Sequence, residues 1–207
     1  KAASGIELHL LFWDGSAWST AATTRTDVDG RYLFTGISSL GPGEVYYVRY
    51  GPNNTDARFL STWETSNVTS YTAGTRVAGG DFDIADVKLL SPAAGATVRL
   101  PETFRWARRV LASHTYCWQL FDPTGGVWWV SNPLGDVGSF TLTGLPEGFR
   151  LGREYGWFVR VDGGTNGYGQ SFYFSRVTFS ASQGHTVQPQ LLEGPEEREP
   201  VGLPAER

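Results

Sequence analysis

The 207-residue sequence contains no methionine, a single cysteine and no long run of apolar residues. With Cys117 alone, no disulfide can form within the chain, and no apolar stretch is long enough to span a membrane as a helix. A secreted origin stays open, because a chain of this size can bury a sufficient core without disulfides. Since residue 1 is not methionine, we expect a processed chain or a piece of a longer protein, with any secretion signal removed or lying upstream.

An excess of positive charge is also lacking. The formal net charge is -4, from 17 Lys and Arg against 21 Asp and Glu. Much of the negative excess lies from Ala181 onward, where the chain has five glutamates and two arginines. The rest is nearly neutral and shows no basic stripe of the kind that follows a phosphate backbone, so we expect no nucleic-acid partner.

Glycine, proline and aromatic residues are abundant: there are 26 glycines, 11 prolines and 14% Phe, Trp and Tyr. Apolar and polar residues alternate with a period of two along much of the chain, and no segment has a clear helical period. The sequence therefore predicts an all-β fold with two consecutive β-sandwich domains, residues 1–88 and 89–180. Residues 181–207 are rich in proline and glutamate and are predicted to form a disordered tail.

In the first half, alternation predicts strands over residues 6–13, 45–50 and 81–86. Between the first two lies TRTDVDGRYLFTG, residues 24–36, which has an Asp-x-Asp-Gly sequence. An EF-hand loop is excluded, because aligning Gly30 with its glycine places Arg25 and Gly36 at positions that need carboxylates. A hairpin turn fits instead, with Asp27 accepting hydrogen bonds from backbone amides and Gly30 at positive φ. Strand-favouring residues spaced by two flank it: Thr24, Thr26, Tyr32 and Phe34.

The second half predicts about seven short strands between residues 91 and 179, separated by glycine and proline turns. The final strand is expected to be SFYFSRVTF, residues 171–179. Bulky residues at alternating positions are expected to fill the sandwich core: Trp106, Tyr116, Trp118, Tyr155 and Trp157.

The hairpin residues 26–36, TDVDGRYLFTG, resemble the T-D-x-D-G-x-Y-x-F-x-G hairpin of carboxypeptidase regulatory-like domains and of B-type repeats of bacterial surface proteins. This resemblance covers about residues 5–88 and implies a transthyretin-like sandwich. B-type domains are known for isopeptide cross-links, which need a buried lysine. The only lysines are Lys1, at the chain end, and Lys88, near the predicted linker, so we expect no such bond.

The second half resembles a fibronectin type III or related immunoglobulin-like domain. Trp106 is placed like the early-strand tryptophan of that family, and Leu151, Gly152 and Tyr155 are similar to its approach to a tyrosine corner, with a shorter spacing between Leu and Tyr. Together the two resemblances imply extracellular stalk, spacer or adhesive modules attached to larger proteins.

Two groups of aspartates are candidates for a calcium site. Asp27 and Asp29 lie at the predicted turn, and Asp81, Asp83 and Asp86 lie where the first predicted domain meets the second. If the groups met, their carboxylates could bind calcium and stiffen the connection. Alternatively, Asp27 serves its turn, and Asp81 and Asp83 form the solvated face of a strand.

Exposed aromatic rings are a second candidate site. Trp128 and Trp129 are consecutive on a predicted strand, so their side chains point to opposite faces and one should leave the core. Tyr168 lies in a glycine-rich loop and is also expected to be exposed. Such rings can bind the apolar faces of sugars. Alternatively, the outer tryptophan packs beneath a loop or the neighbouring domain.

Catalytic residues and cofactors are not predicted, because the sequence has no HExxH, GxSxG or P-loop motif. His9 lies on the polar side of a strand, His114 precedes one and His185 lies in the tail, while Cys117 is expected to be a packed thiol. The sequence predicts a non-catalytic spacer or interaction module of a larger secreted or surface-anchored bacterial protein, with the other domains of that protein as partners. The alternative is a module that binds carbohydrate or another surface polymer.

Overall fold

A computed structural model of the chain describes residues 3–51, 55–109 and 114–181, and within these ranges thirteen strands and one short 3-10 helix are present. The all-β prediction is confirmed. A search of the same ranges finds no helix with the length and apolar character needed to cross a membrane. The predicted disordered tail lies outside the described residues from residue 182 on.

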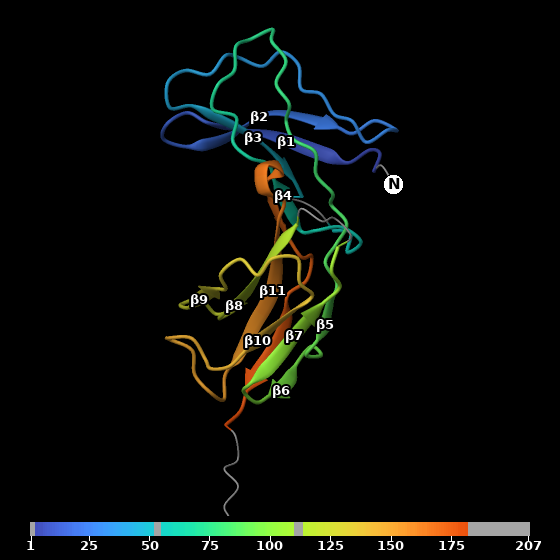
Figure 1. The fold of residues 1–207 in the computed structure, drawn as a ribbon. Coiled ribbons are helices and arrows are strands. Elements are labelled where there is room, and N and C mark those ends of the chain that lie inside the picture. The colour runs from blue at the N-terminus through green and yellow to red at the C-terminus, as the bar shows by residue number, and fades with distance from the viewer. Residues whose placement is uncertain (1–2, 52–54, 110–113, 182–207) are drawn as a thin grey trace, which may run out of the picture.

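Four strands of the first half belong to a long sheet in the order β2-β1-β3-β4 (Figure 1). Alternation explains β1, where Leu8 and Leu10 are buried while His9 lies between them on the outer face. At the turn that follows, Asp14 Oδ1 accepts hydrogen bonds from the amides of Ser16 and Ala17 at 2.7 and 2.8 Å. The strands are β1 (Glu7–Trp13), β2 (Trp18–Arg25), β3 (Val45–Tyr50) and β4 (Thr62–Glu64).

The second half is a sandwich of a three-stranded sheet, β10-β7-β5, and the remainder of the long sheet, in which β11 pairs with β8, β12 and β13. Strand β6 adds to β13 in parallel, and β9 adds to β8. The bounds are β5 (Leu89–Ser91), β6 (Ala96–Val98), β7 (Glu102–Trp106), β8 (Thr115–Phe121), β9 (Trp128–Val130), β10 (Ser139–Leu142), β11 (Glu154–Asp162), β12 (Tyr168–Gln170) and β13 (Ser175–Phe179), with the 3-10 helix η1 (Gly164–Asn166).

Aromatic rings fill the space between these two sheets. Phe104 of β7 contacts Trp118 and Trp157 of the facing sheet, with ring centroids 4.5 and 5.1 Å apart. All three side chains are fully buried, and such contacts add to the free energy gained from burying their apolar area. The predicted core is present in full, because each member is at most 2% exposed: Trp106, Tyr116, Trp118, Tyr155 and Trp157.

A tyrosine corner is present at the start of β11. The hydroxyl oxygen of Tyr155 accepts a hydrogen bond from the backbone amide of Arg150 at 2.8 Å. Gly152, between them, has φ of 78°, which lets the chain turn back within the shortened spacing. The corner therefore forms even though the spacing between Leu151 and Tyr155 is shorter than in that family.

The predicted hairpin turn forms in the first half, but the strand expected after it does not. Asp27 Oδ1 accepts hydrogen bonds from the amides of Asp29 and Arg31 at 2.9 and 2.8 Å, and Gly30 has φ of 75°. Residues 31–40 then continue as an irregular segment. The Tyr32 hydroxyl donates a hydrogen bond to Gly80 O at 2.8 Å. This side-chain contact holds Tyr32 in place, so its ring can be partly buried although the backbone of residues 31–40 is not paired in a sheet.

Residues 81–86 also differ from prediction, since they form no strand. The expected alternation is present: Ile84 is buried, Phe82 is partly buried, and Asp81 and Asp83 face outward. However, Asp83 Oδ1 accepts a hydrogen bond from the Ala85 amide at 2.8 Å, which bends the backbone locally. A single bridge from Ala85 to Phe59 replaces the expected ladder.

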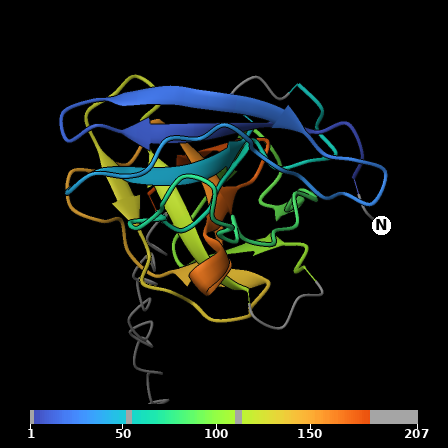
Figure 2. The same cartoon turned by 90° about the horizontal axis from the view of Figure 1, so that it is seen from above.

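One connection between the halves was not predicted at all. Strand β4 pairs with β3 on one side and with β12 on the other, so the long sheet passes from the first half into the second. Figures 1 and 2 show β1–β3 lying across the end of the second-half sandwich, with β4 and the β11–β12 connection between them. The boundary at residue 88 stays a prediction, but the halves share backbone hydrogen bonds as well as a covalent link.

Candidate functional site

The junction between the halves is the first candidate site, and Trp63 of β4 lies at its centre. We define the junction as β4, residues 81–86, Arg109, His114 and residues 163–172. Trp63 is fully buried, and its indole Nε1 donates a hydrogen bond to Asn166 O at 2.9 Å. Its ring stacks on Phe82 with centroids 5.8 Å apart and planes inclined by 9°. A side chain of the first half thus packs directly against the backbone of the second.

Glycines of the second half allow this close approach. A Cβ atom on Gly169 would lie 2.6 Å from the Trp63 ring, and one on Gly167 would lie 1.9 Å from Glu64 O. Gly167 also has φ of 95°, a conformation that other residues adopt only with strain. The β4–β12 ladder therefore depends on residues without side chains at these two positions.

A buried cation joins the two halves. The Arg109 side chain is only 5% exposed, and its Nη2 lies 2.9 Å from Asp83 Oδ2 and also donates to Asp83 O. Its guanidinium lies 5.9 Å from the centroid of the Trp63 ring, within the range of a cation–π contact. Because a buried charge without a partner is costly, this ion pair ties residues 81–86 to the second half.

Two carboxyl groups and one imidazole of the junction have shifted pKa values. Burial raises the pKa of Asp86, although its carboxylate accepts a hydrogen bond from the Phe172 amide at 2.7 Å. Burial also acts to raise the pKa of Asp83, but the hydrogen bond from the Ala85 amide and the charge of Arg109 outweigh burial and lower the pKa of that carboxyl. Burial and the neighbouring Arg109 lower the pKa of His114, so its imidazole is neutral at pH 7.

The five aspartates proposed for calcium do not gather at one site. Asp27 accepts amide hydrogen bonds in its turn, Asp83 pairs with Arg109, and Asp86 accepts the Phe172 amide. Asp29 lies beside Arg31, and Asp81 is exposed. Across residues 3–51, 55–109 and 114–181, no group of three or more His, Cys, Asp and Glu side chains is arranged to hold a metal ion. Three of the five thus have turn or junction roles.

A row of polar side chains crosses the junction on the outer face of the sheet. Glu64 Oε1 lies 3.5 Å from Arg49 Nε, and Glu64 Oε2 accepts a hydrogen bond from the Tyr168 hydroxyl at 2.6 Å. The guanidinium of Arg160 lies 4.1 Å from the centroid of the Tyr168 ring. The expectation that Tyr168 is exposed is therefore wrong: it is half-buried, and burial together with the Glu64 carboxylate raises its pKa to about 12.

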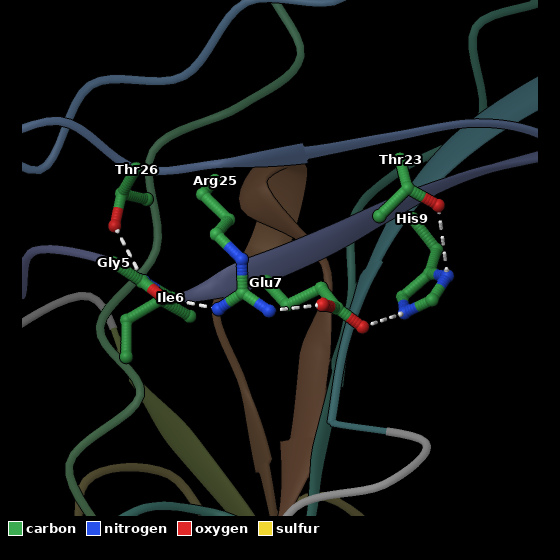
Figure 3. Close-up of polar contacts among 7 residues, drawn as sticks. All are labelled: Gly5, Ile6, Glu7, His9, Thr23, Arg25 and Thr26. Atoms are coloured by element: carbon green, nitrogen blue, oxygen red, sulfur yellow. Dashed lines mark hydrogen bonds and ion pairs between the residues drawn. The ribbon is translucent and has the colours of Figure 1, made fainter.

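Figure 3 shows a second polar network, at the open end of the β1–β2 hairpin. Glu7 lies between Arg25, at 2.5 Å, and His9, at 3.3 Å, and the other ring nitrogen of His9 is 3.5 Å from Thr23 Oγ1. Arg25 also donates to Gly5 O at 2.9 Å. The side chains of Arg25 and Glu7 are well exposed, so their ion pair contributes at most about 1 kcal/mol. The network fits a role in fixing the hairpin end.

Cys117 and the histidines, considered above as catalytic candidates, lie in different settings. Cys117 is buried, and burial raises the pKa of its thiol, which makes it a poor nucleophile at neutral pH. His9 belongs to the hairpin network and His114 to the junction. His185 lies outside the described residues.

The side chains of Trp128 and Trp129 point to opposite faces of the sheet, as the alternation of side chains along a strand requires. Trp129 turns inward, where its ring lies 5.9 Å from Trp118 and 6.0 Å from Phe140, measured between centroids. Trp128 turns outward and is 59% exposed. The sequence could not show which of the two would leave the core, because either register satisfies the pattern.

Neither a protein-family model nor a curated protein matches this chain. Among solved structures, the chain is similar to a tetra-tandem repeat in the extending region of a large adhesion protein, with 17% sequence identity and a TM-score of 0.23. The alignment covers 86% of this chain and 41% of that one, so the chain spans less than half of its length. At this TM-score the likeness carries no weight for function, which must rest on the contacts described above.

Proposed function

We propose that this chain is a non-catalytic spacer or interaction module of a larger secreted or surface-anchored protein, and that its two halves are held at a fixed angle. The observation that carries the proposal is the β4–β12 ladder, which makes one sheet common to both halves. A spacer with a flexible linker would not share backbone hydrogen bonds across its joint.

Two further contacts support a fixed angle. The Trp63 indole is fully buried against residues of the second half, and Arg109 is buried with Asp83 as its charged partner. Opening the joint would expose the indole and leave the cation without its carboxylate. The assignments to transthyretin-like and fibronectin type III-like domains, the extracellular location and the absence of a cofactor are parts of the same proposal.

The fixed angle can be tested by measuring distances between two spin labels, one on each half. Thr20 of β2 and Thr141 of β10 are exposed positions suited to cysteine labelling in a Cys117→Ala background. Pulsed electron paramagnetic resonance should give a single narrow distance distribution, because the joint has no hinge. A broad or double distribution in the parent protein would contradict the proposal.

A matched pair of variants controls this measurement. Trp63→Ala removes the indole at the centre of the junction and should broaden the distribution. Trp128→Ala removes a tryptophan that is 59% exposed and remote from β4 in the strand order, so it should leave the distribution unchanged. Circular dichroism must show that both variants retain their strands, so that broadening reports the joint rather than unfolding.

A further inference from the structure

Four aromatic rings linked by ring contacts, with Phe121 touching each of the other three, lie on the outer face of the second-half sheet, away from the sandwich core. We call this group the aromatic platform: Phe121, Trp128, Phe158 and Phe174. Trp128 stacks on Phe121 with centroids 5.1 Å apart and planes inclined by 27°, and the rings of Trp128 and Phe158 meet edge to face with centroids 5.6 Å apart. Phe174 meets Phe121 edge to face at 5.2 Å.

The platform has a buried layer and an exposed layer. Phe158 is 6% exposed, whereas Trp128 is 59% and Phe174 is 46% exposed. Phe121 stacks on one face of the Trp128 indole, yet most of the Trp128 side chain remains exposed to solvent. Packing alone explains the burial of Phe158, but it does not explain two large rings left exposed on the same side of the sheet.

A glycine lets the rings lie flat on the sheet. A Cβ atom on Gly156 of β11 would lie 2.4 Å from Phe121 Cζ, so any larger residue there would push the Phe121 ring away from the strand. Trp128 stacks on that ring and would move with it. Gly156 is therefore a positioning residue for the platform.

The exposed indole is fixed in orientation. Trp128 Nε1 donates a hydrogen bond to Gln119 Oε1 at 2.9 Å, and Gln119 is itself only 4% exposed. The indole N–H is already hydrogen-bonded and one face of the ring is stacked on Phe121. The Trp128 side chain therefore has a fixed conformation before any ligand binds, and it presents a flat apolar surface. Such preorganisation lowers the entropic cost of binding a ligand.

The rim of the platform is polar but carries little net charge. Arg176 Nη1 pairs with Glu154 Oε1 at 2.5 Å, and the Arg176 guanidinium lies 5.6 Å from the centroid of the Phe174 ring. Both side chains of the ion pair are about half exposed, so they retain donor and acceptor capacity towards a ligand. Because the two charges cancel, the platform favours an uncharged partner that is rich in hydroxyl groups and has flat apolar faces.

We propose that the aromatic platform binds an uncharged glycan. A pyranose ring stacks its C–H face on the open side of Trp128, and hydroxyl groups of the same or the next sugar bond to Arg176 and Glu154. This inference is independent of the spacer proposal, since the platform lies outside the junction and can bind whether or not the halves are held at a fixed angle.

Affinity electrophoresis of the full 207-residue chain in gels containing a soluble neutral polysaccharide tests the proposal. Mixed-linkage β-glucan, xyloglucan, galactomannan and dextran serve as the probes. At least one should retard the parent protein, and Trp128→Ala should weaken that retardation about ten-fold, because the stacking surface is lost. Trp128→Phe keeps an aromatic face and should retain most of the binding, while Gly156→Ala should weaken it by displacing Phe121.

Trp18→Ala provides the matched control. Trp18 is 47% exposed and contacts Trp13 and Tyr47 on the first-half sheet, at 5.3 and 4.9 Å between centroids, so it is a comparable ring elsewhere. Its loss should leave binding unchanged. The proposal is overturned if none of the four polysaccharides retards the parent, or if Trp18→Ala abolishes binding while Trp128→Ala does not.

A second copy of the chain is the competing occupant of the platform. Sedimentation velocity of the parent and of Trp128→Ala distinguishes it from a glycan. A concentration-dependent dimer that is lost in Trp128→Ala, together with no retardation by polysaccharide, would assign the platform to self-association and overturn the proposal. A monomer that is retarded supports it.

Discussion

Aspartate side chains in this protein bind backbone amides repeatedly. Asp14, Asp27 and Asp122 each accept hydrogen bonds from amides two or more residues ahead, at 2.7 to 2.9 Å. This use explains why the sequence around Asp27 resembles part of a metal loop, since both need a carboxylate followed by a tight glycine turn. Asp83 does the same within the junction. At this scale, acidic spacing alone does not distinguish a turn from an ion site.

Asp83 and Asp86 should contribute to pH dependence with opposite signs. The pKa of Asp83 is lowered on folding, so its contribution to the free energy of unfolding is present above the unfolded pKa and is lost as pH falls through the folded value. The pKa of Asp86 is raised, so its contribution diminishes as pH rises from the unfolded value through the folded one. Asp83→Asn should therefore destabilise the protein at neutral pH, whereas Asp86→Asn keeps an acceptor for Phe172 and should not.

Urea denaturation between about pH 3 and 7 measures both effects. We expect Asp83→Asn to cost about 1 kcal/mol at pH 7 and less in acid, a modest value because the carboxylate is half exposed and screened by solvent. Asp86→Asn should match or exceed the parent at pH 7. Asp29→Asn, at an exposed turn position, is the control and should change little. Loss of stability at pH 7 in Asp86→Asn would show that its charge is needed.

The two halves are joined by the pairing of β4 with β12, and each of these strands has only three residues. Gly167 precedes β12 and approaches Glu64 O too closely for any side chain, whereas Gly164 in η1 has φ of 64° and open space around its Cβ position. Alanine at either position meets backbone strain, but only Gly167→Ala also forces β4 and β12 apart. The difference between the two variants combines the clash with β4 and the stronger backbone strain at Gly167, whose ψ of -156° lies in a region that essentially only glycine adopts.

Equilibrium unfolding should therefore rank these two glycines. Gly164→Ala should lower the free energy of unfolding by about 1 kcal/mol, from the strained φ alone. Gly167→Ala should cost about 3 kcal/mol or more, because the backbone must shift to relieve the clash. Equal losses in the two variants would mean that the ladder contributes little.

Alternation predicted some elements well and others not at all. The strand expected over residues 45–50 coincides with β3, and the aromatic core of the second half is buried as predicted. Strands β4 and β12 could not be predicted, because three residues carry no measurable period and their partners are about a hundred residues apart in sequence. Residues 31–40 and 81–86 show the converse: alternation reports which side chains are buried, not whether the backbone pairs.

The candidate sites were predictable to different degrees. That one of two consecutive tryptophans would face outward follows from strand geometry, and Trp128 does so. Trp128 contacts Phe121 and Phe158, and Phe121 in turn contacts Phe174, so these rings join three strands and a loop and no local pattern contains them. The Arg109–Asp83 pair was missed for the same reason.

At the scale of the whole molecule, the shared sheet and the buried junction should make the two halves unfold together. Differential scanning calorimetry of the parent should show one transition whose calorimetric and van't Hoff enthalpies agree. Trp63→Ala removes the indole between the halves and should separate this into two transitions. Two transitions in the parent would instead show that the halves are independently stable.

The first and last described strands also have neighbours on both sides. Strand β1 pairs with β2 and β3, and β13 pairs with β11 and β6. The two lie towards opposite ends of the molecule (Figure 1). If the chain were pulled from both ends, each of these strands would have to lose its hydrogen bonds to two neighbours before it left the sheet. Resistance to stretching would then be greatest where tension enters and leaves the protein.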